Sequence, residues 1–388
     1  MSSSKILCIT NDFGPRAGGI ETFVIGLIER LPIGSVIVYT SSQTGSAPFD
    51  AAWREKFGVE VIRDRSTILL PSRRVGNNVR ALVLERGISR VFFGAAAPLG
   101  LLSHGLRKVG VKKIVALTHG HEVWWAKLWP FSQLLRRIGA GVDHLTYLGE
   151  FTRQQISRAL TESAKQAMVK IAPGIDTEHF APHVDAEQLK TELGLVGKKI
   201  IVSVGRLVHR KGQDTLVEAL PHILHHIPEA HLLFIGEGPR KDFMLQRAKK
   251  LGVSSHITFI GRIQYPDLPK YIGVGNLFAM PSRSRLAGLE VEGLGIVYLE
   301  ASSCGLPVLG GSSGGAPDAV IDGETGFVVD GTSTADVAQA AIRLLQDESL
   351  ATRLGLRGRQ WIIDEWQWDG WAKRFSALLT EDQPFVPR

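Results

Sequence analysis

Apolar, β-branched runs recur along the chain and alternate with amphipathic stretches. They form two series, each typical of buried strands. The first series lies at 5–10, 36–40, 59–62, 90–93, 113–117 and 144–148. The second lies at 200–204, 231–235, 257–260, 276–280, 307–309 and 326–329. Because strands that alternate with helices form parallel sheets covered on both faces, the pattern predicts two doubly wound α/β domains.

A stretch rich in helix and strand breakers, 172–182, separates the two series. We therefore expect one domain at 1–172 and a second at 173–369, which agrees with a length of 388 residues. The tail at 350–379 has the pattern of consecutive helices with four tryptophans at helical spacing. Such aromatic residues indicate packing rather than a cofactor site.

Composition describes a soluble globular protein, with 44% hydrophobic and 21% charged residues. A net charge of +7 favours an anionic partner, and nucleic acid is the least favoured because no nucleic-acid-binding signature is present. The chain enters its first strand without an apolar leader, and no run is long enough to span a membrane. Two isolated cysteines, Cys8 and Cys304, favour a reducing cytoplasm.

Two carboxylates, Glu292 and Glu300, stand eight residues apart around a glycine turn. A helix that begins near Gly295 places Glu292 in the preceding loop and Glu300 more than one turn inside the helix. Free N–H groups and the helix dipole at such a start suit an anionic or hydroxyl-rich ligand. Because the same spacing also describes a solvated helix cap, the pair needs support from other motifs.

A basic loop follows the first strand of the second series. The strand breaks at Gly205, and Arg206, Arg210 and Lys211 follow before a helical pattern begins at Gln213. A strand, a basic loop and a helix in this order are typical of phosphate binding, because arginine pairs with phosphate oxygens and lysine adds a mobile charge. The alternative is a solvated basic turn.

A glycine-rich loop follows the first strand of the chain. Gly18 and Gly19 precede an amphipathic run, so backbone N–H groups there can approach a phosphate closely. The G-x-G-x-x-G fingerprint is absent here and at 236–240, which disfavours an NAD-dependent oxidoreductase. All three motifs follow strands, and open parallel sheets bind ligands beyond the carboxyl ends of their strands.

Together these motifs resemble those of the retaining glycosyltransferases of family 4, whose signature is a Glu-x7-Glu pair like Glu292 and Glu300. The resemblance covers nearly the whole chain and includes the loop at Gly18 and Gly19, the basic loop, and the stretch 314–326.

Two positions depart from the family pattern: Asp318, where glutamate is usual, and Leu294, where many members have phenylalanine. The resemblance implies the GT-B fold, in which two Rossmann-like domains face a cleft. It also implies that a C-terminal helix at about 370–388 crosses back to the first domain.

The resemblance implies that Glu292 and the backbone amides around Gly295 and Ile296 hold the hydroxyls of the donor sugar. Glu300 would bind the ribose of the nucleotide. The first domain would bind the acceptor and the second domain the sugar nucleotide.

By the same resemblance, Arg206 and Lys211 clamp the diphosphate, and the loop at Gly18 and Gly19 joins them when the domains close. The nucleotide base would lie near Arg262 and Ile263.

His119 matches the position at which related enzymes carry a histidine that faces the donor sugar. A metal site formed by His119, His121 and Glu122 is an alternative, but three adjacent loop residues rarely complete a tetrahedral site. We therefore expect neither a metal nor a cofactor, with the sugar nucleotide as a substrate.

Among family members, the chain looks most like those that transfer mannose from GDP-mannose to a phosphatidylinositol mannoside lipid, adding the second mannose in an α-1,6 linkage. This implies a cytoplasmic enzyme peripherally associated with the inner face of the plasma membrane. A glucosyltransferase that uses UDP- or ADP-glucose on a soluble acceptor, and a non-catalytic sugar-nucleotide-binding protein, remain alternatives.

An anionic membrane surface is the expected partner of such an enzyme, and the first domain has suitable residues. Cations beside aromatic side chains suit an anionic bilayer, although a solvated face with ordinary packing explains any single residue equally well. The cations are Arg63, Arg65, Arg73, Arg74, Arg80, Arg107, Lys108, Lys112, Lys113, Lys127, Arg136 and Arg137, and the aromatic residues are Trp124, Trp125, Trp129 and Phe131.

Overall fold

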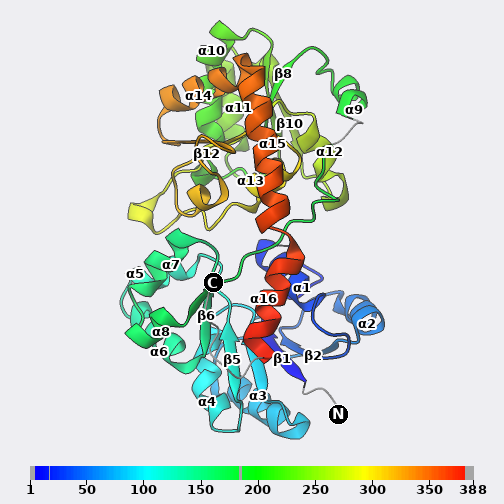
Figure 1. Ribbon diagram of the computed structural model, residues 1–388, viewed down its shortest axis with the longest axis vertical. Helices are drawn as coiled ribbons and strands as arrows, with labels where there is room; N and C mark the ends of the chain where they lie inside the picture. The colour runs from blue at the N-terminus through cyan, green and yellow to red at the C-terminus, as the bar shows by residue number, and fades with distance from the viewer. Residues whose placement is uncertain (1–4, 17, 183–185, 381–388) are drawn as a thin grey trace. The chain divides into compact units, whose positions relative to one another are not determined.

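The computed structural model describes residues 5–16, 18–182 and 186–380. The chain divides into two compact units. Unit 1 comprises the chain up to Gly174 together with the C-terminal segment from Trp368, and unit 2 comprises Ile175–Gln367. Figure 1 shows a parallel sheet covered by helices in each unit.

Unit 1 is built on a seven-stranded parallel sheet in the order β3-β2-β1-β4-β5-β6-β7. Its strands are β1 (Ile6–Thr10), β2 (Val36–Thr40), β3 (Glu60–Arg63), β4 (Arg90–Phe93), β5 (Lys113–Ala116), β6 (His144–Tyr147) and β7 (Met168–Lys170). Its helices are α1 (Gly19–Ile28), α2 (Ser46–Phe57), α3 (Arg73–Arg86), η1 (Leu99–Leu102), α4 (Ser103–Arg107), α5 (Glu122–Lys127), α6 (Phe131–Gly141), α7 (Glu150–Ser157), α8 (Glu162–Gln166) and α16 (Trp368–Thr380).

Both faces of the unit 1 sheet are buried, as a parallel sheet requires. On one face, alternate residues such as Leu7 and Val91 join a core that includes residues of α3, α4 and α6. The C-terminal helix α16 packs on α1 and on strands β4 and β5. Phe375 of α16 meets Phe92 edge to face, with ring centroids 5.1 Å apart. The last helix is therefore part of the core of unit 1.

Unit 2 has a six-stranded parallel sheet in the order β10-β9-β8-β11-β12-β13. Its strands are β8 (Lys199–Val204), β9 (Ala230–Ile235), β10 (Ile257–Gly261), β11 (Leu277–Met280), β12 (Val308–Gly311) and β13 (Gly326–Val329). Its helices are α9 (Ala186–Glu192), η2 (His209–Lys211), α10 (Gln213–His226), α11 (Lys241–Lys250), η3 (Ser254–His256), η4 (Tyr265–Asp267), α12 (Leu268–Gly273), η5 (Leu286–Gly288), α13 (Ile296–Ser303), η6 (Ala316–Ala319), α14 (Thr334–Gln346) and α15 (Glu348–Glu365).

The unit 2 core lies between the sheet and helices α10, α11 and α14, and includes Ile201, Leu216 and Val337. On the other side of the sheet, α13 packs against β11, β12 and α15. These helices hold the loops that follow β8 and β11 at the carboxyl edge of the sheet. The basic loop follows β8, the Glu-x7-Glu segment follows β11, and the predicted base-binding residues follow β10.

The predicted fold class of two doubly wound α/β domains is confirmed, and each expected strand is present to within two residues of its expected bounds. Strand β7 was not predicted, because three residues are too few to show a periodic pattern. The predicted C-terminal helix corresponds to α16, and its expected end at 381–388 lies outside the described residues. Within the described chain, no helix is both long and apolar enough to cross a membrane.

Candidate functional site

The loop that follows β11 leads into helix α13. Gly295 precedes the helix in a left-handed conformation (φ 78°), which glycine adopts without strain. The Tyr298 hydroxyl donates to the Met280 carbonyl oxygen over 2.6 Å, so the first turn of α13 is fixed to the end of β11. The helix starts at Ile296, as predicted. The first N–H groups of a helix have no partner within it and are available to a ligand.

Glu292 lies in this loop and is only 7% exposed. Its Oε2 atom lies 2.7 Å from Arg210 Nη1 and 2.8 Å from Lys211 Nζ. Burial pushes the pKa of Glu292 upward, but the charges of Lys211 and Arg210 outweigh burial and hold the pKa below its ordinary value. Glu292 is therefore an ionised carboxylate whose position is set by the basic loop.

Glu300 lies inside α13 and is 6% exposed. Burial raises its pKa to about 7, and the charge of Lys211 counteracts only part of that effect. Lys211 thus acts on both carboxylates of the Glu-x7-Glu pair. The two carboxylates differ in their protonation, because Glu292 faces two cations at close range whereas Glu300 does not.

Arg206 follows β8 at the carboxyl edge of the unit 2 sheet, and its side chain is exposed. Among the described residues it has no side-chain hydrogen bond or ion pair, so its guanidinium is available to a ligand. Arg262, also exposed, and the half-buried Ile263 follow β10 at the same edge. The Gly236 N–H donates to the Gly261 carbonyl oxygen over 2.7 Å, which joins the ends of β9 and β10.

Gly18 and Gly19 lie in unit 1, at the start of α1. Gly19 is exposed, and a Cβ atom added there would meet nothing within 4 Å, so its backbone is open to approach. The Glu21 carboxylate lies beside Gly18 and receives a hydrogen bond of 2.7 Å from Arg16 Nε. The start of α1 therefore carries the negative charge of Glu21 beside the free N–H groups of its first turn.

His119 also lies in unit 1, in the loop after β5. Its Nε2–H donates to the Gly94 carbonyl oxygen over 2.5 Å, and its backbone N–H donates to Glu122 Oε2 over 3.0 Å. Burial lowers the pKa of His119, so the imidazole is neutral at neutral pH. Glu122 is fully buried and lies 3.2 Å from His121 Nε2. Nowhere in the described chain are three or more metal-ligating side chains arranged to hold a metal ion.

Asp12 adds a titratable group to the same edge of the unit 1 sheet. Burial, together with the charge of Glu21, raises the pKa of Asp12 to about 6. Arg16 opposes this rise and lies 3.5 Å from the carboxylate.

Several basic residues that the sequence assigned to a membrane face have structural roles in unit 1. Arg63 pairs with Asp50 over 2.7 Å, Arg74 with Asp64 over 2.7 Å, and Arg107 with Asp143 over 2.6 Å. The aromatic residues also divide: Trp124, Trp125 and Phe131 pack on one another, with ring centroids 4.9 to 5.6 Å apart. Trp129, by contrast, is 81% exposed.

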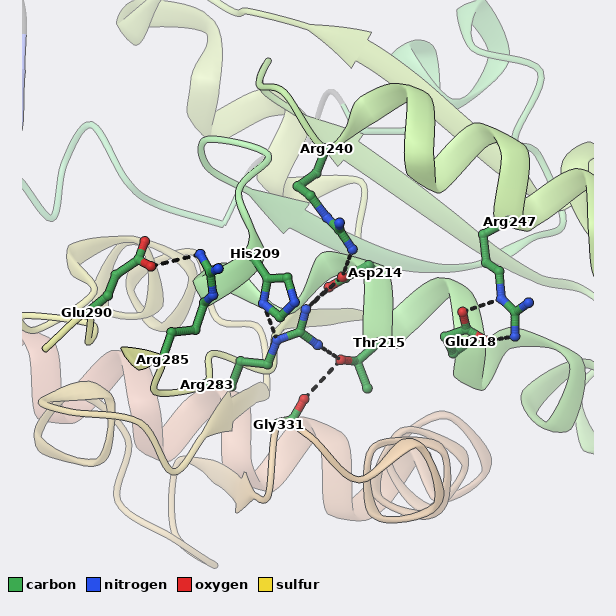
Figure 2. A network of polar contacts seen from close by, with 10 residues as sticks. All are labelled: His209, Asp214, Thr215, Glu218, Arg240, Arg247, Arg283, Arg285, Glu290 and Gly331. Carbon is green, nitrogen blue, oxygen red and sulfur yellow. Dashed lines mark hydrogen bonds and ion pairs between the residues drawn. The ribbon is translucent and has the colours of Figure 1, made fainter. Parts of the chain in front are cut away.

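Sequence reasoning missed the contacts of two residues of the unit 2 site. Arg210 was noted in the basic loop, but its contact with Glu292 was not predicted. Arg283 carries no sequence signal, although it joins the two loops of the site (Figure 2). Only the spacing of Arg210 beside Lys211 could have suggested a shared partner.

Comparison with known proteins identifies the family of this chain. The model of the family described as glycosyl transferases group 1 matches residues 185–361. A GDP-mannose-dependent alpha-(1-6)-phosphatidylinositol monomannoside mannosyltransferase of Mycolicibacterium smegmatis is 41% identical over 97% of this chain and 98% of its own length. The chain belongs to the group 1 glycosyl transferases. It is therefore an enzyme of the glycosyltransferase class.

A second relative, the GDP-mannose-dependent monoacylated alpha-(1-6)-phosphatidylinositol monomannoside mannosyltransferase of Corynebacterium glutamicum, is 36% identical over 98% of this chain and 99% of its own length. The solved structure of the Anabaena protein HepE, in complex with UDP, superposes with a TM-score of 0.81. It covers 97% of this chain and 99% of its own, at 17% identity. This likeness confirms the predicted GT-B fold.

Proposed function

We propose that this enzyme transfers mannose from GDP-mannose to a phosphatidylinositol monomannoside lipid, with retention, forming an α-1,6 linkage. The observation that carries the proposal is the near-full-length similarity to an enzyme named for mannose transfer from GDP-mannose to phosphatidylinositol monomannoside, which is 41% identical to this chain. The unit 2 site agrees with a sugar nucleotide, because Arg210 and Lys211 contact the buried Glu292 and the exposed Arg206 follows a strand at the same sheet edge.

In this proposal, Arg206 and Lys211 bind the diphosphate and Glu292 accepts hydrogen bonds from hydroxyls of mannose. The amides at Gly295 and Ile296 donate to the same sugar. Glu300 accepts hydrogen bonds from the ribose. Each carboxylate is buried, where a hydrogen bond to a sugar hydroxyl is stronger than in water.

The nucleotide base would lie against Arg262 and Ile263. Gly18 and Gly19 of unit 1 would add backbone N–H groups to the diphosphate, and His119 would face the sugar. Because the Nε2–H of His119 is taken by Gly94, its Nδ1 atom would serve as the hydrogen-bond acceptor toward a ligand.

Departure of GDP leaves negative charge on the β-phosphate and positive charge on the anomeric carbon. Arg206 and Lys211 would lower the barrier by stabilising the leaving phosphate. We propose front-face substitution, in which the acceptor hydroxyl attacks from the side that GDP leaves. Because the new bond forms on the face that GDP leaves, the product keeps the α configuration. A phosphate oxygen of GDP takes the proton of the acceptor hydroxyl. The reaction as proposed requires no cofactor and no metal.

Product analysis by mass spectrometry tests this function. The protein is incubated with a phosphatidylinositol monomannoside and with GDP-mannose, UDP-glucose or ADP-glucose in separate reactions. We expect a lipid one hexose heavier with GDP-mannose alone, and much less of it with the Lys211→Ala variant. Consumption of a glucose donor with the lipid unchanged would instead support a soluble acceptor, and no consumption of any donor would support a non-catalytic binding protein.

We further propose that unit 1 binds the surface of an anionic membrane from the cytoplasmic side, where the lipid acceptor lies. Ile68 and Leu70, in the loop between β3 and α3, are 65% and 58% exposed. Arg65 and Arg73 flank them with exposed side chains. Apolar side chains that enter the bilayer beside cations suit an anionic surface, where each cation contributes up to about 1 kcal/mol.

Flotation with vesicles of neutral or anionic phospholipid tests this surface. We expect the wild-type protein to float with anionic vesicles only, and the double variant Ile68→Ser, Leu70→Ser to lose flotation. Leu356→Ser is a matched control, because Leu356 is 63% exposed but lies on α15 of unit 2. Equal flotation with neutral and anionic vesicles would contradict the proposal. So would a loss of flotation in Leu356→Ser as large as that in the double variant.

A further inference from the structure

A polar network in unit 2 joins the loop that carries Glu292 to the basic loop, and Arg283 lies at its centre (Figure 2). Arg283 Nε donates to His209 Nδ1 over 3.0 Å, and Nη1 donates to Thr215 Oγ1 over 2.7 Å. Its Nη2 donates to both carboxylate oxygens of Asp214, over 2.7 and 2.6 Å. A single side chain of the Glu292 loop therefore holds three residues of the basic loop and of the helix after it.

Backbone contacts also join the Glu292 loop to the basic loop. The Arg283 N–H donates to the Arg210 carbonyl oxygen over 2.8 Å, and the Arg210 side chain returns to Glu292. Gly212 fits against Pro281 so closely that an added Cβ atom would lie 1.8 Å from the Pro281 carbonyl oxygen. The two loops are thus in contact through backbone, side chain and close packing.

The far end of the network is itself fixed. Asp214 is 7% exposed and also accepts a 2.6 Å hydrogen bond from Arg240 Nη2. Burial alone would raise the pKa of Asp214, but its bonds to Arg283 and Arg240 hold that pKa below its ordinary value. Thr215 Oγ1 donates onward to the Gly331 carbonyl oxygen over 2.9 Å. Asp214 is therefore an ionised anchor.

Arg283 is occupied by these contacts, and its side chain is only 12% exposed. Three of its guanidinium nitrogens donate to protein atoms, and its charge faces Asp214. A phosphate would have to displace an ionised carboxylate to reach it. This separates Arg283 from Arg206, whose exposed side chain can meet a ligand directly.

We propose that Arg283 is a positioning residue that sets the distance and angle at which Glu292 and Lys211 meet the donor. The inference rests on the proposed function, because it takes these two residues to hold the sugar and the diphosphate. A displacement of about 1 Å between groups that hold the two ends of a reacting bond can lower turnover about a hundredfold. Fixing the two loops to one buried aspartate prevents such a displacement.

The test compares Arg283→Met and Arg283→Lys with Arg247→Met. Arg247 also pairs with a carboxylate, donating from Nη2 to Glu218 over 2.8 Å, but that pair joins α11 to α10 away from both loops (Figure 2). We expect Arg283→Met to lower kcat for mannose transfer about a hundredfold, with a smaller change in KM for GDP-mannose. The kcat of Arg283→Lys should lie between those of Arg283→Met and the wild type. The kcat of Arg247→Met should stay within about twofold of the wild-type value.

A double variant distinguishes positioning from a general loss of structure. In a Lys211→Ala background, Arg283→Met should lower kcat by about tenfold or less rather than about a hundredfold, because one of the two groups that it positions is already gone. An equal loss in both backgrounds, or a kcat for Arg283→Met equal to that of the wild type, would overturn the inference. If Arg283→Met does not fold, Arg283→Lys decides by the same criteria.

Amide hydrogen exchange without any ligand gives a second readout. Peptides that cover 206–212 and 281–292 should exchange faster in Arg283→Met than in the wild type and in Arg247→Met. Unchanged exchange there would overturn the inference. If the wild-type protein transfers no mannose at all, the proposed function fails, and the exchange experiment still decides whether Arg283 fixes the two loops.

Discussion

Glu300 gives the sharpest test of the site, because its burial has consequences for stability and for binding that run in opposite directions. Its pKa is raised from 4.5 to about 7. Since a tenfold change in proton affinity corresponds to about 1.4 kcal/mol, ionising Glu300 costs about 3 kcal/mol more in the fold than in the unfolded chain. The substitution Glu300→Gln removes this cost and keeps the shape of the side chain.

The sign follows from the raised pKa. The stabilising contribution of the protonated carboxyl is fully present below pH 4.5 and is lost as the pH rises through about 7. Relative to the wild type, Glu300→Gln should therefore gain up to about 3 kcal/mol in the free energy of unfolding between pH 5 and pH 8. The difference between the two urea midpoints, measured at each pH, reports this gain because other titrating groups are common to both proteins.

Donor binding should change in the opposite sense. If ribose hydroxyls donate to Glu300, only the ionised carboxylate accepts both, so the Kd for GDP-mannose should rise about tenfold between pH 8 and pH 6. Glu300→Gln should bind more weakly and lose this pH dependence. Titration calorimetry without the lipid acceptor measures the Kd and its pH dependence. GDP-mannose is the ligand rather than GDP, because it has no terminal phosphate that titrates in this pH range.

Glu218→Gln is the matched control, because Glu218 is a partly exposed carboxylate of the same unit, paired with Arg247. It should keep the wild-type pH dependence of binding. A wild-type Kd that stays constant between pH 6 and pH 8, or a Glu300→Gln variant with an unchanged slope, would refute the assignment of Glu300 to the ribose.

Four further substitutions test the same unit. Arg206→Ala should lower kcat at least about a hundredfold at an unchanged melting temperature, because the side chain is exposed and is proposed to bind the diphosphate. Lys211→Ala should lower both kcat and the melting temperature, because Glu292 then loses a buried partner. Gly212→Ala should lower the melting temperature, because residue 212 has a φ of 73° and no room for a Cβ atom beside Pro281. Tyr298→Phe should lower the free energy of unfolding in urea by about 1 kcal/mol, since the Met280 carbonyl oxygen loses one of its two donors and keeps the Ser282 N–H.

The Glu-x7-Glu segment could be predicted from sequence because its geometry is local. A glycine turn followed by a helical pattern fixes where Glu292 and Glu300 lie relative to the helix start, whatever surrounds them. The basic loop was predictable for the same reason, since a β-branched run that breaks at a glycine marks the end of a buried strand. Periodicity gave the strands, and failed only at β7, which has three residues.

The contacts that join these segments could not be predicted. Arg283 and Asp214 are separated by 69 positions in the chain and meet because β11 pairs with β8 in the sheet. Strand order is not encoded in local patterns, so neither the Arg283 network nor the contact between Arg210 and Glu292 has a sequence signature. The electrostatic difference between Glu292 and Glu300 also depends on these contacts, because it comes from burial and from cations of another loop.

The arrangement of charges argues that this part of unit 2 is adapted to a ligand rather than to its own stability. An apolar residue in place of Glu300 would avoid the cost of a buried carboxyl at neutral pH, and removing the Glu292 group would avoid burying an ion pair. Both carboxylates instead lie within the influence of Lys211, one as its ion-pair partner and one with a pKa near neutrality. Residues that reduce stability without a structural gain are expected at functional sites. In this chain they occur at the sheet edge where the sequence motifs predict a sugar-nucleotide site and where we propose that the donor binds.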